Sequence, residues 1–142
     1  TPVTCAAGIA ALDLVQKTNA CQDAIAYGDG LIDGLNVMFR QEGVSWIAYG
    51  TYGGFHVFLN PEGITTDRQR IEAAEHDFGT MKAAVPPEVS LKLRVGLLLA
   101  GVDIQGWPGA PVSAAHTEAD RDQTIEAFRQ TLRALREEGA LA

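Results

Sequence analysis

Three histidines are the side chains of this sequence best suited to acid, base or ligand chemistry near neutral pH. His56 lies in a strand-like pattern and is expected to be half-buried and hydrogen-bonded. His116 precedes the last helix, where a structural hydrogen bond is the expected role. His76 lies on a polar helix face and is expected to be solvated. None has a neighbouring partner in sequence that favours catalysis, so all three are predicted to be structural or solvated.

Residues 50–54, Gly-Thr-Tyr-Gly-Gly, are rich in glycine, but no helix start with a Lys-Ser or Lys-Thr pair follows them. A phosphate-binding loop needs that arrangement, so a hairpin turn or a bulge is expected instead. The carboxylates Glu72, Glu75 and Asp77 resemble a solvated helix face. No catalytic Ser-His-Asp pattern and no zinc-ligand spacing is present, so no metal site is expected. Residue spacing alone therefore gives no active site.

Residues 107–111, Trp-Pro-Gly-Ala-Pro, form an aromatic, proline-rich loop between an apolar segment and a short strand expected near Val112. Such loops often shape pockets, although a purely structural loop fits equally well. Trp107 is the one candidate for a substrate-pocket residue.

Two helices are predicted at the start of the chain. Thr1 and Pro2 form a helix-start signature for residues 3–17, where apolar residues on one face and several small residues predict burial on more than one side. Residues 20–41 follow with helical spacing, and Gly43 is a natural stop. Their apolar stripe comprises Ile25, Leu31, Leu35, Met38 and Phe39.

The middle of the chain is mixed. Residues 45–49 and 55–59 are strand-like. Thr66 or Asp67 is expected to cap a helix over residues 69–82. After Pro86-Pro87, alternating apolar residues fit a strand, whereas Leu91, Val95, Leu98 and Leu99 fit a helix face. Residues 118–137 are predicted to be an amphipathic helix that opens with a capping box. This order indicates an α+β fold.

The chain has 142 residues and a net charge of −7, which suits one folded domain and argues against a partner that is a nucleic acid. No apolar run approaches the length of a membrane span. Cys5 and Cys21 do not make a disulfide framework, and no secretory signal is evident. A cytoplasmic protein is therefore expected.

The last third resembles one family. Residues 97–104, Leu-Leu-Leu-Ala-Gly-Val-Asp-Ile, and residues 112–120, Val-Ser-Ala-Ala-His-Thr-Glu-Ala-Asp, resemble the carboxyl end of glutamate-1-semialdehyde 2,1-aminomutases. Residues 2–12 resemble that family's Asn-Pro-x-x-x-Ala-Ala-Gly helix, with Thr1 in place of Asn. Gly50-Thr51-x-x-Gly54 resembles its Gly-Ser-x-x-Gly strand break. The resemblance covers nearly the whole chain, in one order.

This resemblance implies the C-terminal small domain of a class III, fold type I pyridoxal-phosphate aminotransferase. Residues 1–19 would be an interdomain helix, residues 20–142 the small domain, and residues 88–100 helical. The implied enzyme is a homodimer that transfers amino groups of an amino-acid or amine substrate through a lysine aldimine of pyridoxal 5'-phosphate. The lysine and the other cofactor-binding residues would lie upstream of this chain, so the chain alone is expected to be an inactive fragment that needs the large domain.

Two departures from the family pattern affect the expected substrate. Pro108 replaces an acidic residue of the aminomutase loop, and the loop lacks the carboxylate-binding arginine of some transaminases. Aminomutase and transaminase both remain open. The alternative from another class is a free-standing, non-catalytic α+β domain used for dimerisation or ligand binding.

Overall fold

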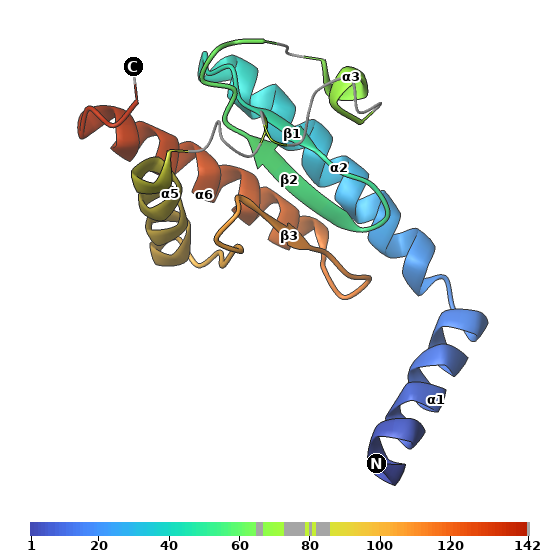
Figure 1. The fold of residues 1–142 in the computed structure, drawn as a ribbon. Coiled ribbons are helices and arrows are strands. Elements are labelled where there is room, and N and C mark those ends of the chain that lie inside the picture. The colour runs from blue at the N-terminus through green and yellow to red at the C-terminus, as the bar shows by residue number, and fades with distance from the viewer. Residues whose placement is uncertain (65–66, 73–78, 80, 82–85, 142) are drawn as a thin grey trace.

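The computed structural model describes residues 1–64, 67–72, 79, 81 and 86–141. Along the chain (Figure 1) the elements are α1 (Pro2–Lys17), α2 (Ala20–Gln41), β1 (Ile47–Tyr49), β2 (Gly54–Phe58), α3 (Arg68–Glu72), α5 (Pro87–Leu99), β3 (Gly109–Pro111) and α6 (Glu118–Glu137). The expected α+β fold is confirmed.

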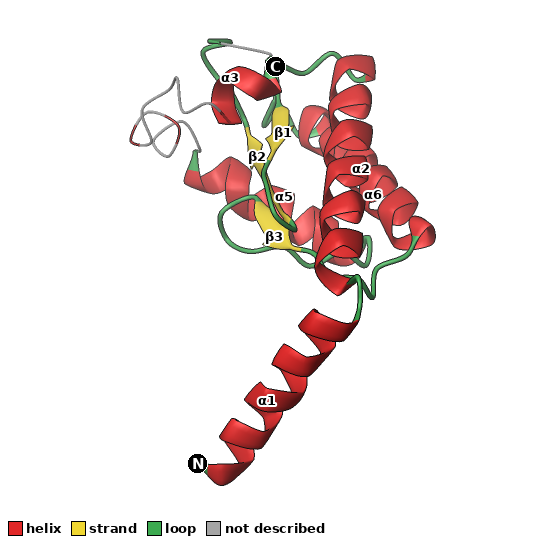
Figure 2. Cartoon of the chain, turned by 90° about the vertical axis from the view of Figure 1, so that its right-hand side faces the viewer, coloured by secondary structure: helices red, strands yellow, loops and turns green. Residues whose placement is uncertain are grey.

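The three strands form one antiparallel sheet in the order β1-β2-β3. Ala48 pairs with Val57, and Phe55 pairs with Ala110, so residues 50–53 form a hairpin turn and not a bulged continuation of one strand. The helices α2 and α6 lie on one side of the sheet and α3 on the other (Figure 2). Other elements therefore pack on both faces of the sheet. Successive side chains of β2 point to opposite faces, as strand geometry requires.

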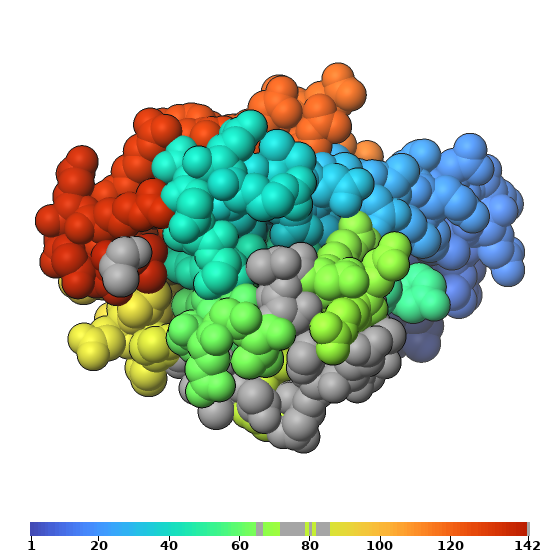
Figure 3. Space-filling model, turned by 90° about the horizontal axis from the view of Figure 1, so that it is seen from above, coloured from blue at the N-terminus to red at the C-terminus, as the bar shows by residue number. Residues whose placement is uncertain are grey.

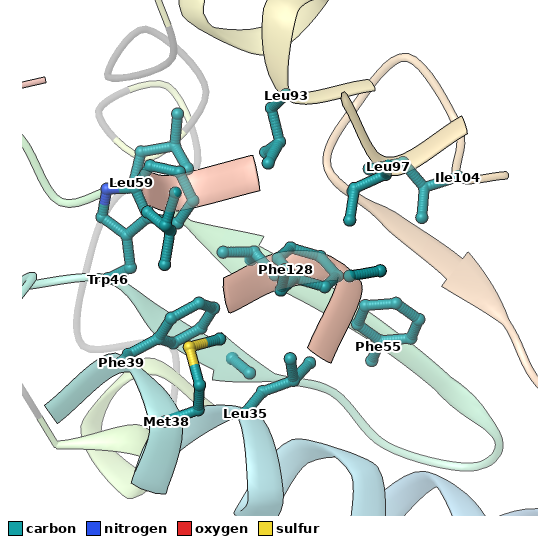
Figure 4. Close-up of a cluster of buried hydrophobic side chains, with 14 of the residues drawn as sticks. Leu35, Met38, Phe39, Trp46, Phe55, Leu59, Leu93, Leu97, Ile104 and Phe128 are labelled. Carbon is teal, nitrogen blue, oxygen red and sulfur yellow. The ribbon is translucent and has the colours of Figure 1, made fainter. Parts of the chain in front are cut away.

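The larger core lies between the sheet, α2, α5 and α6. Phe128 of α6 occupies its centre (Figure 4), with the Phe39 ring centroid 6.0 Å away in an edge-to-face arrangement. From α5, Leu93 and Leu97 are fully buried against this cluster. Most of the stripe predicted for α2 is buried here, and Ile25 is only partly buried.

Two asparagine side chains connect neighbouring segments by hydrogen bonds to the backbone. The Asn36 amide of α2 donates to the Ala48 carbonyl and accepts from the Ala48 amide, both at 2.8 Å, as a neighbouring strand would. Asn60 is completely buried, and its amide donates to the Ser45 carbonyl at 2.9 Å. Asn36 thus joins the middle of β1 to α2, and Asn60 closes the open end of the hairpin, since buried backbone groups need partners.

The C-terminal ends of α2 and α6 adjoin on the face seen from above (Figure 3). There Glu42 forms ion pairs with Arg129 at 3.1 Å and with Arg133 at 2.8 Å, and Arg136 also reaches it. The hydrogen bond from Arg133 is the main cause that lowers the pKa of the Glu42 carboxyl. This cluster joins two helices that are far apart in sequence.

The first helix is placed differently from the expectation. It starts at Pro2 with Thr1 as its cap, as predicted, but it projects from the body (Figures 1 and 2) and none of its residues is buried. Ile9 and Leu12 are each 65% exposed. The prediction of burial on more than one side is therefore wrong for this chain by itself, because no element among the described residues covers the helix.

The segment after Pro86 is helical, as the family resemblance implied, but its buried face differs from the predicted one. Leu93 and Leu97 pack into the core, whereas Leu91, Val95, Leu98 and Leu99 are exposed. The helical spacing of those four apolar residues therefore predicted the wrong buried face of α5. Both faces are apolar, and periodicity cannot show which one the rest of the chain covers.

Most other boundaries agree with prediction. The helices over residues 20–41 and 118–137 are confirmed. Asp67 accepts from the Gln69 amide at 2.9 Å and so caps α3. Of the remainder of the helix predicted to reach residue 82, only residues 79 and 81 are described, and both are helical. Thr66, His76, Glu75 and Asp77 and the Glu72 side chain lie outside the described residues.

Candidate functional site: a pocket beside Trp107

One of the segments that carry the family resemblance, residues 112–120, forms the start of α6. The Ser113 amide donates to His116 Nδ1 at 3.0 Å, and the His116 ring stacks on Tyr27. Thr117 and Asp120 form the expected capping box: the Thr117 amide donates to the Asp120 carboxylate at 2.7 Å. The hydrogen-bonding role predicted for His116 is therefore confirmed, and the motif orients the start of α6.

Hydrogen bonds hold the Trp107 loop against the sheet. The Pro108 carbonyl accepts from the Val57 amide at 2.7 Å, and the Gly109 carbonyl accepts from the Gln105 amide at 2.9 Å. A side chain at Gly109 would lie 2.3 Å from the Phe55 carbonyl oxygen, so only glycine fits where β3 meets β2. The loop is thus a rigid structure, with Pro108 buried and Trp107 half-buried at its rim.

Trp107 lines a surface pocket between this loop and the N-terminal half of α5. The Ser90 hydroxyl donates to the Gly106 carbonyl at 2.9 Å and ties the two sides together. The pocket is lined by Pro87, Ser90, Leu91, Arg94, Gly106, Trp107 and Pro108. The structure therefore places the predicted pocket residue in a pocket wall made mainly of apolar groups.

Arg94 is the functional candidate that the sequence did not reveal. It lies on α5, thirteen positions before Trp107, yet both line the same pocket. Its guanidinium Nη2 is 3.6 Å from Asp103 Oδ1, and the Arg94 side chain is 47% exposed. The sequence signal that could have identified Arg94 is its helical spacing from Ser90 and Leu91. Residues three and four positions apart lie on the same side of a helix.

The hairpin turn borders a second pocket on the opposite side of β2, lined by Tyr49, Gly50, Thr51, Gly54, His56 and Ile71. The His56 ring lies 5.6 Å from the Tyr49 ring. Partial burial lowers the pKa of His56 and raises the pKa of Tyr49. His56 is more exposed than expected, because its side chain points to the outer face of the sheet. Partial desolvation favours its neutral form.

The described part of the chain offers no other evident centre of chemistry. Within it, no group of three or more His, Cys, Asp or Glu side chains is arranged to hold a metal ion. None of the described helices has the length and apolar character needed to cross a bilayer. Cys5 and Cys21 are exposed free thiols. The Trp107 pocket contains the residue that the sequence singled out for a substrate pocket, so it is the candidate site.

Comparison with known proteins starts from the sequence. No family model matches the chain. The glutamate-1-semialdehyde 2,1-aminomutase of Laribacter hongkongensis is 29% identical over 136 residues, which span 91% of this chain and 28% of that protein. The matched part is a C-terminal portion of the relative.

Solved structures share the fold. The pyridoxal-phosphate internal aldimine form of the FumI protein of Sphingopyxis sp. MTA144 matches with a TM-score of 0.71 and 21% identity, over 95% of this chain and 27% of that one. A glutamate-1-semialdehyde aminomutase from Pseudomonas aeruginosa PAO1 matches with a TM-score of 0.68 and 16% identity, over 82% of this chain and 24% of that one.

An omega-transaminase from Sphaerobacter thermophilus matches with a TM-score of 0.62 and 16% identity, over 81% of this chain and 24% of that one. The chain therefore spans about a quarter of the length of the proteins that it matches. Its sequence and its fold both resemble the C-terminal small domain of the class III, fold type I pyridoxal-phosphate aminotransferases and aminomutases, as the motifs predicted.

Proposed function

We propose that this chain is the C-terminal small domain of a pyridoxal-phosphate-dependent aminotransferase or aminomutase that acts on an amino-acid or amine substrate. The observation that carries the proposal is the sequence similarity to glutamate-1-semialdehyde 2,1-aminomutase along 91% of the chain. The cofactor, when bound, supplies an electron sink for carbanions at the substrate.

The described residues of this chain do not fit the cofactor itself. Pyridoxal phosphate needs a lysine as its covalent partner. Lys17 is exposed and paired with Asp13 at 2.8 Å, and Lys92 is exposed and paired with Glu138 at 2.9 Å. Neither lies in the Trp107 pocket. The reacting lysine therefore belongs, in this proposal, to a large domain upstream of this chain, and the chain by itself is inactive.

Two exposed apolar surfaces support docking to that large domain. One is α1, on which Val3 is 80% exposed and Ile9 and Leu12 are each 65% exposed. The other is the outer face of α5. Exposed apolar patches of this kind mark interaction surfaces. We accordingly assign residues 1–19 as an interdomain helix, which ends at the break around Thr18, and residues 20–142 as the small domain.

The role of the small domain is to close one side of the substrate pocket. The Trp107 loop is rigid and presents an indole wall, and Pro108 stands where aminomutases carry an acidic residue. This substitution favours a transaminase over a strict aminomutase. We further propose a cytoplasmic homodimer, as the family resemblance implies.

Absorption spectroscopy tests the proposal most directly. The full reading frame that contains this chain is expected to show a visible band with pyridoxal phosphate that borohydride fixes to a lysine, and the 142-residue chain alone is expected to show none. Mass spectrometry of the reduced protein would locate the lysine. Without such a band in the full-length protein, the proposal fails, and a free-standing dimerisation or ligand-binding domain becomes the better account.

A further inference from the structure

The pocket beside the hairpin turn is a hollow between two rings and a stretch of glycine backbone. It is lined by Tyr49, Gly50, Thr51, Gly54, His56 and Ile71. The ring centroids of Tyr49 and His56 are 5.6 Å apart, and the two rings are tilted by 37°. The cavity has a volume of about 270 Å³. Sites for drug-sized ligands have roughly 300–1,000 Å³, so this pocket suits a group the size of one ring.

Gly54 opens the floor of this pocket although no neighbouring group requires a glycine there. It begins β2 and pairs with Pro111 of β3. Its φ is not positive, and an added Cβ would meet nothing nearer than the Ala110 carbonyl oxygen at 3.9 Å. Residues two apart in a strand face the same side, so a side chain here would fill the space beside His56. A glycine in a strand often marks the close approach of a ligand or of another backbone.

Three hydrogen-bonding side chains line the pocket without using their donors and acceptors inside the described part of the chain. The Tyr49 hydroxyl, the Thr51 hydroxyl and the His56 ring make no hydrogen bond to a described residue. Burial raises the pKa of Tyr49 and lowers the pKa of His56, so both favour their uncharged forms at neutral pH. A hydroxyl both donates and accepts, and a neutral imidazole does the same through its two nitrogens.

The pocket offers no charge to an ionic ligand. No Asp, Glu, Lys or Arg is among the described residues that line it. Arg68 of α3 reaches the Gly50 carbonyl at 3.4 Å, but its guanidinium also pairs with Asp29 at 3.0 Å and with Asp33 at 3.1 Å. An ion in the pocket would lose water and gain no opposite charge, which is unfavourable. An uncharged group would avoid that cost.

We propose that this pocket binds a planar, uncharged group that both donates and accepts hydrogen bonds, such as a carboxamide on an aromatic ring. Tyr49, Thr51 and His56 supply the hydrogen bonds, the backbone at Gly54 supplies a flat surface, and Ile71 supplies an apolar contact. The inference goes beyond the proposed function and does not depend on it, because every group that it uses lies in this chain.

A series of ring compounds that differ in charge tests the inference in the full-length protein. Benzamide, benzoate and benzylamine have the same ring and are respectively neutral, anionic and cationic at neutral pH. An NMR titration with isotope-labelled histidine follows the His56 ring signal, which is identified by its absence from His56→Phe. Benzamide is expected to shift this signal in a saturable way, whereas benzoate and benzylamine leave it in place.

Substitutions locate the site. Gly54→Val is expected to abolish benzamide binding, because a branched side chain suits a strand and fills the floor of the pocket. Tyr49→Phe keeps the ring and removes the hydroxyl, so benzamide affinity should fall about 2–10-fold, the effect of one neutral hydrogen bond. Gly106→Val is the matched control. It adds the same side chain beside the Trp107 pocket, where its Cβ meets nothing within 4 Å, and should leave benzamide binding unchanged.

The outcomes separate this site from the proposed function. The site is overturned if benzamide leaves the His56 signal unchanged, or if it binds Gly54→Val and Tyr49→Phe as tightly as wild type. Equal binding of benzoate or benzylamine overturns the uncharged class of ligand. An unchanged His116 signal shows that each variant is folded, and Tyr49→Phe decides the question if Gly54→Val does not fold. A full-length protein without a cofactor band overturns the proposed function and leaves this titration unaffected.

Discussion

Gly34 and Gly96 lie in the middle of helices where a glycine is intrinsically unfavourable. A side chain at Gly34 would come within 2.4 Å of Ile125 Cδ1, and one at Gly96 within 2.5 Å of Thr131 Cγ2. Both glycines therefore mark places where another helix, α6, packs directly onto the backbone. At these two positions close packing decides the residue and helix propensity does not.

The Gly96→Ala substitution tests this explanation. The added methyl group would push α5 away from α6, and overpacking of this kind costs about 1–3 kcal/mol in the free energy of unfolding. Gly30→Ala is the matched control, because its new methyl group would meet nothing nearer than Arg121 Nη1 at 3.6 Å. That variant should gain up to about 1 kcal/mol from helix propensity. Urea denaturation of both variants measures the difference, and equal effects would contradict the packing account.

At the scale of elements, the start of α6 depends on a short sequence with a complete set of hydrogen bonds. The Asp120 carboxylate accepts from the Thr117 amide at 2.7 Å and from the Thr117 hydroxyl at 2.8 Å. The backbone hydrogen bond is the main cause that lowers the pKa of Asp120, with the hydroxyl and the nearby His116 adding to it. The anionic form is thus the one that caps the helix.

Asp120→Asn is therefore expected to destabilise the protein in a pH-dependent way. A depressed folded-state pKa adds stability above the ordinary aspartate value, and this stability is lost as the pH falls through the folded-state pKa. The variant should unfold more readily than wild type at neutral pH and approach it in acid. Thermal unfolding over this pH range measures the gap. Glu118→Gln should change less, because Glu118 takes no part in the capping box; a gap independent of pH would argue against the ionised cap.

At the scale of the whole molecule, the main feature is that α1 has no buried residue. α1 is rich in alanine and aliphatic residues, and its apolar side chains face solvent on all sides. A helix that is apolar all round is normally buried. Among the described residues, the core buries the apolar faces of the sheet, α2 and α6, and most exposed large apolar side chains lie on α1 and the outer side of α5.

The 142-residue chain alone is therefore expected to self-associate through α1. Replacing Ile9 and Leu12 by glutamate should shift it toward the monomer, because two buried charges at a contact are unfavourable. Sedimentation velocity at several concentrations measures the association. Gln16→Glu adds a charge to the same helix at a polar position and should have less effect. A wild-type chain that sediments as a monomer at every concentration would contradict this prediction.

The sequence by itself determined much of the local structure of this protein and showed its resemblance to known enzymes. Caps, stops and periodicity predicted the helices at both ends of the chain. The two hairpin strands were also predicted, although β1 is shorter in the structure than its predicted range of residues 45–49. These signals succeed because hydrogen bonds to helix ends and side-chain alternation involve residues a few positions apart. The motif around His116 carried much of that resemblance because it encodes a specific helix start.

Only the tertiary structure decided which apolar face of α5 is buried and that Arg94 shares a pocket with Trp107. It also decided that the described part of the chain leaves α1 uncovered. Each depends on contacts between segments distant in sequence. Both faces of α5 are apolar, so periodicity could not rank them. The position of Arg94 follows from how α5 packs on α6, where Gly96 admits Thr131 and fixes which side of the helix turns toward the loop.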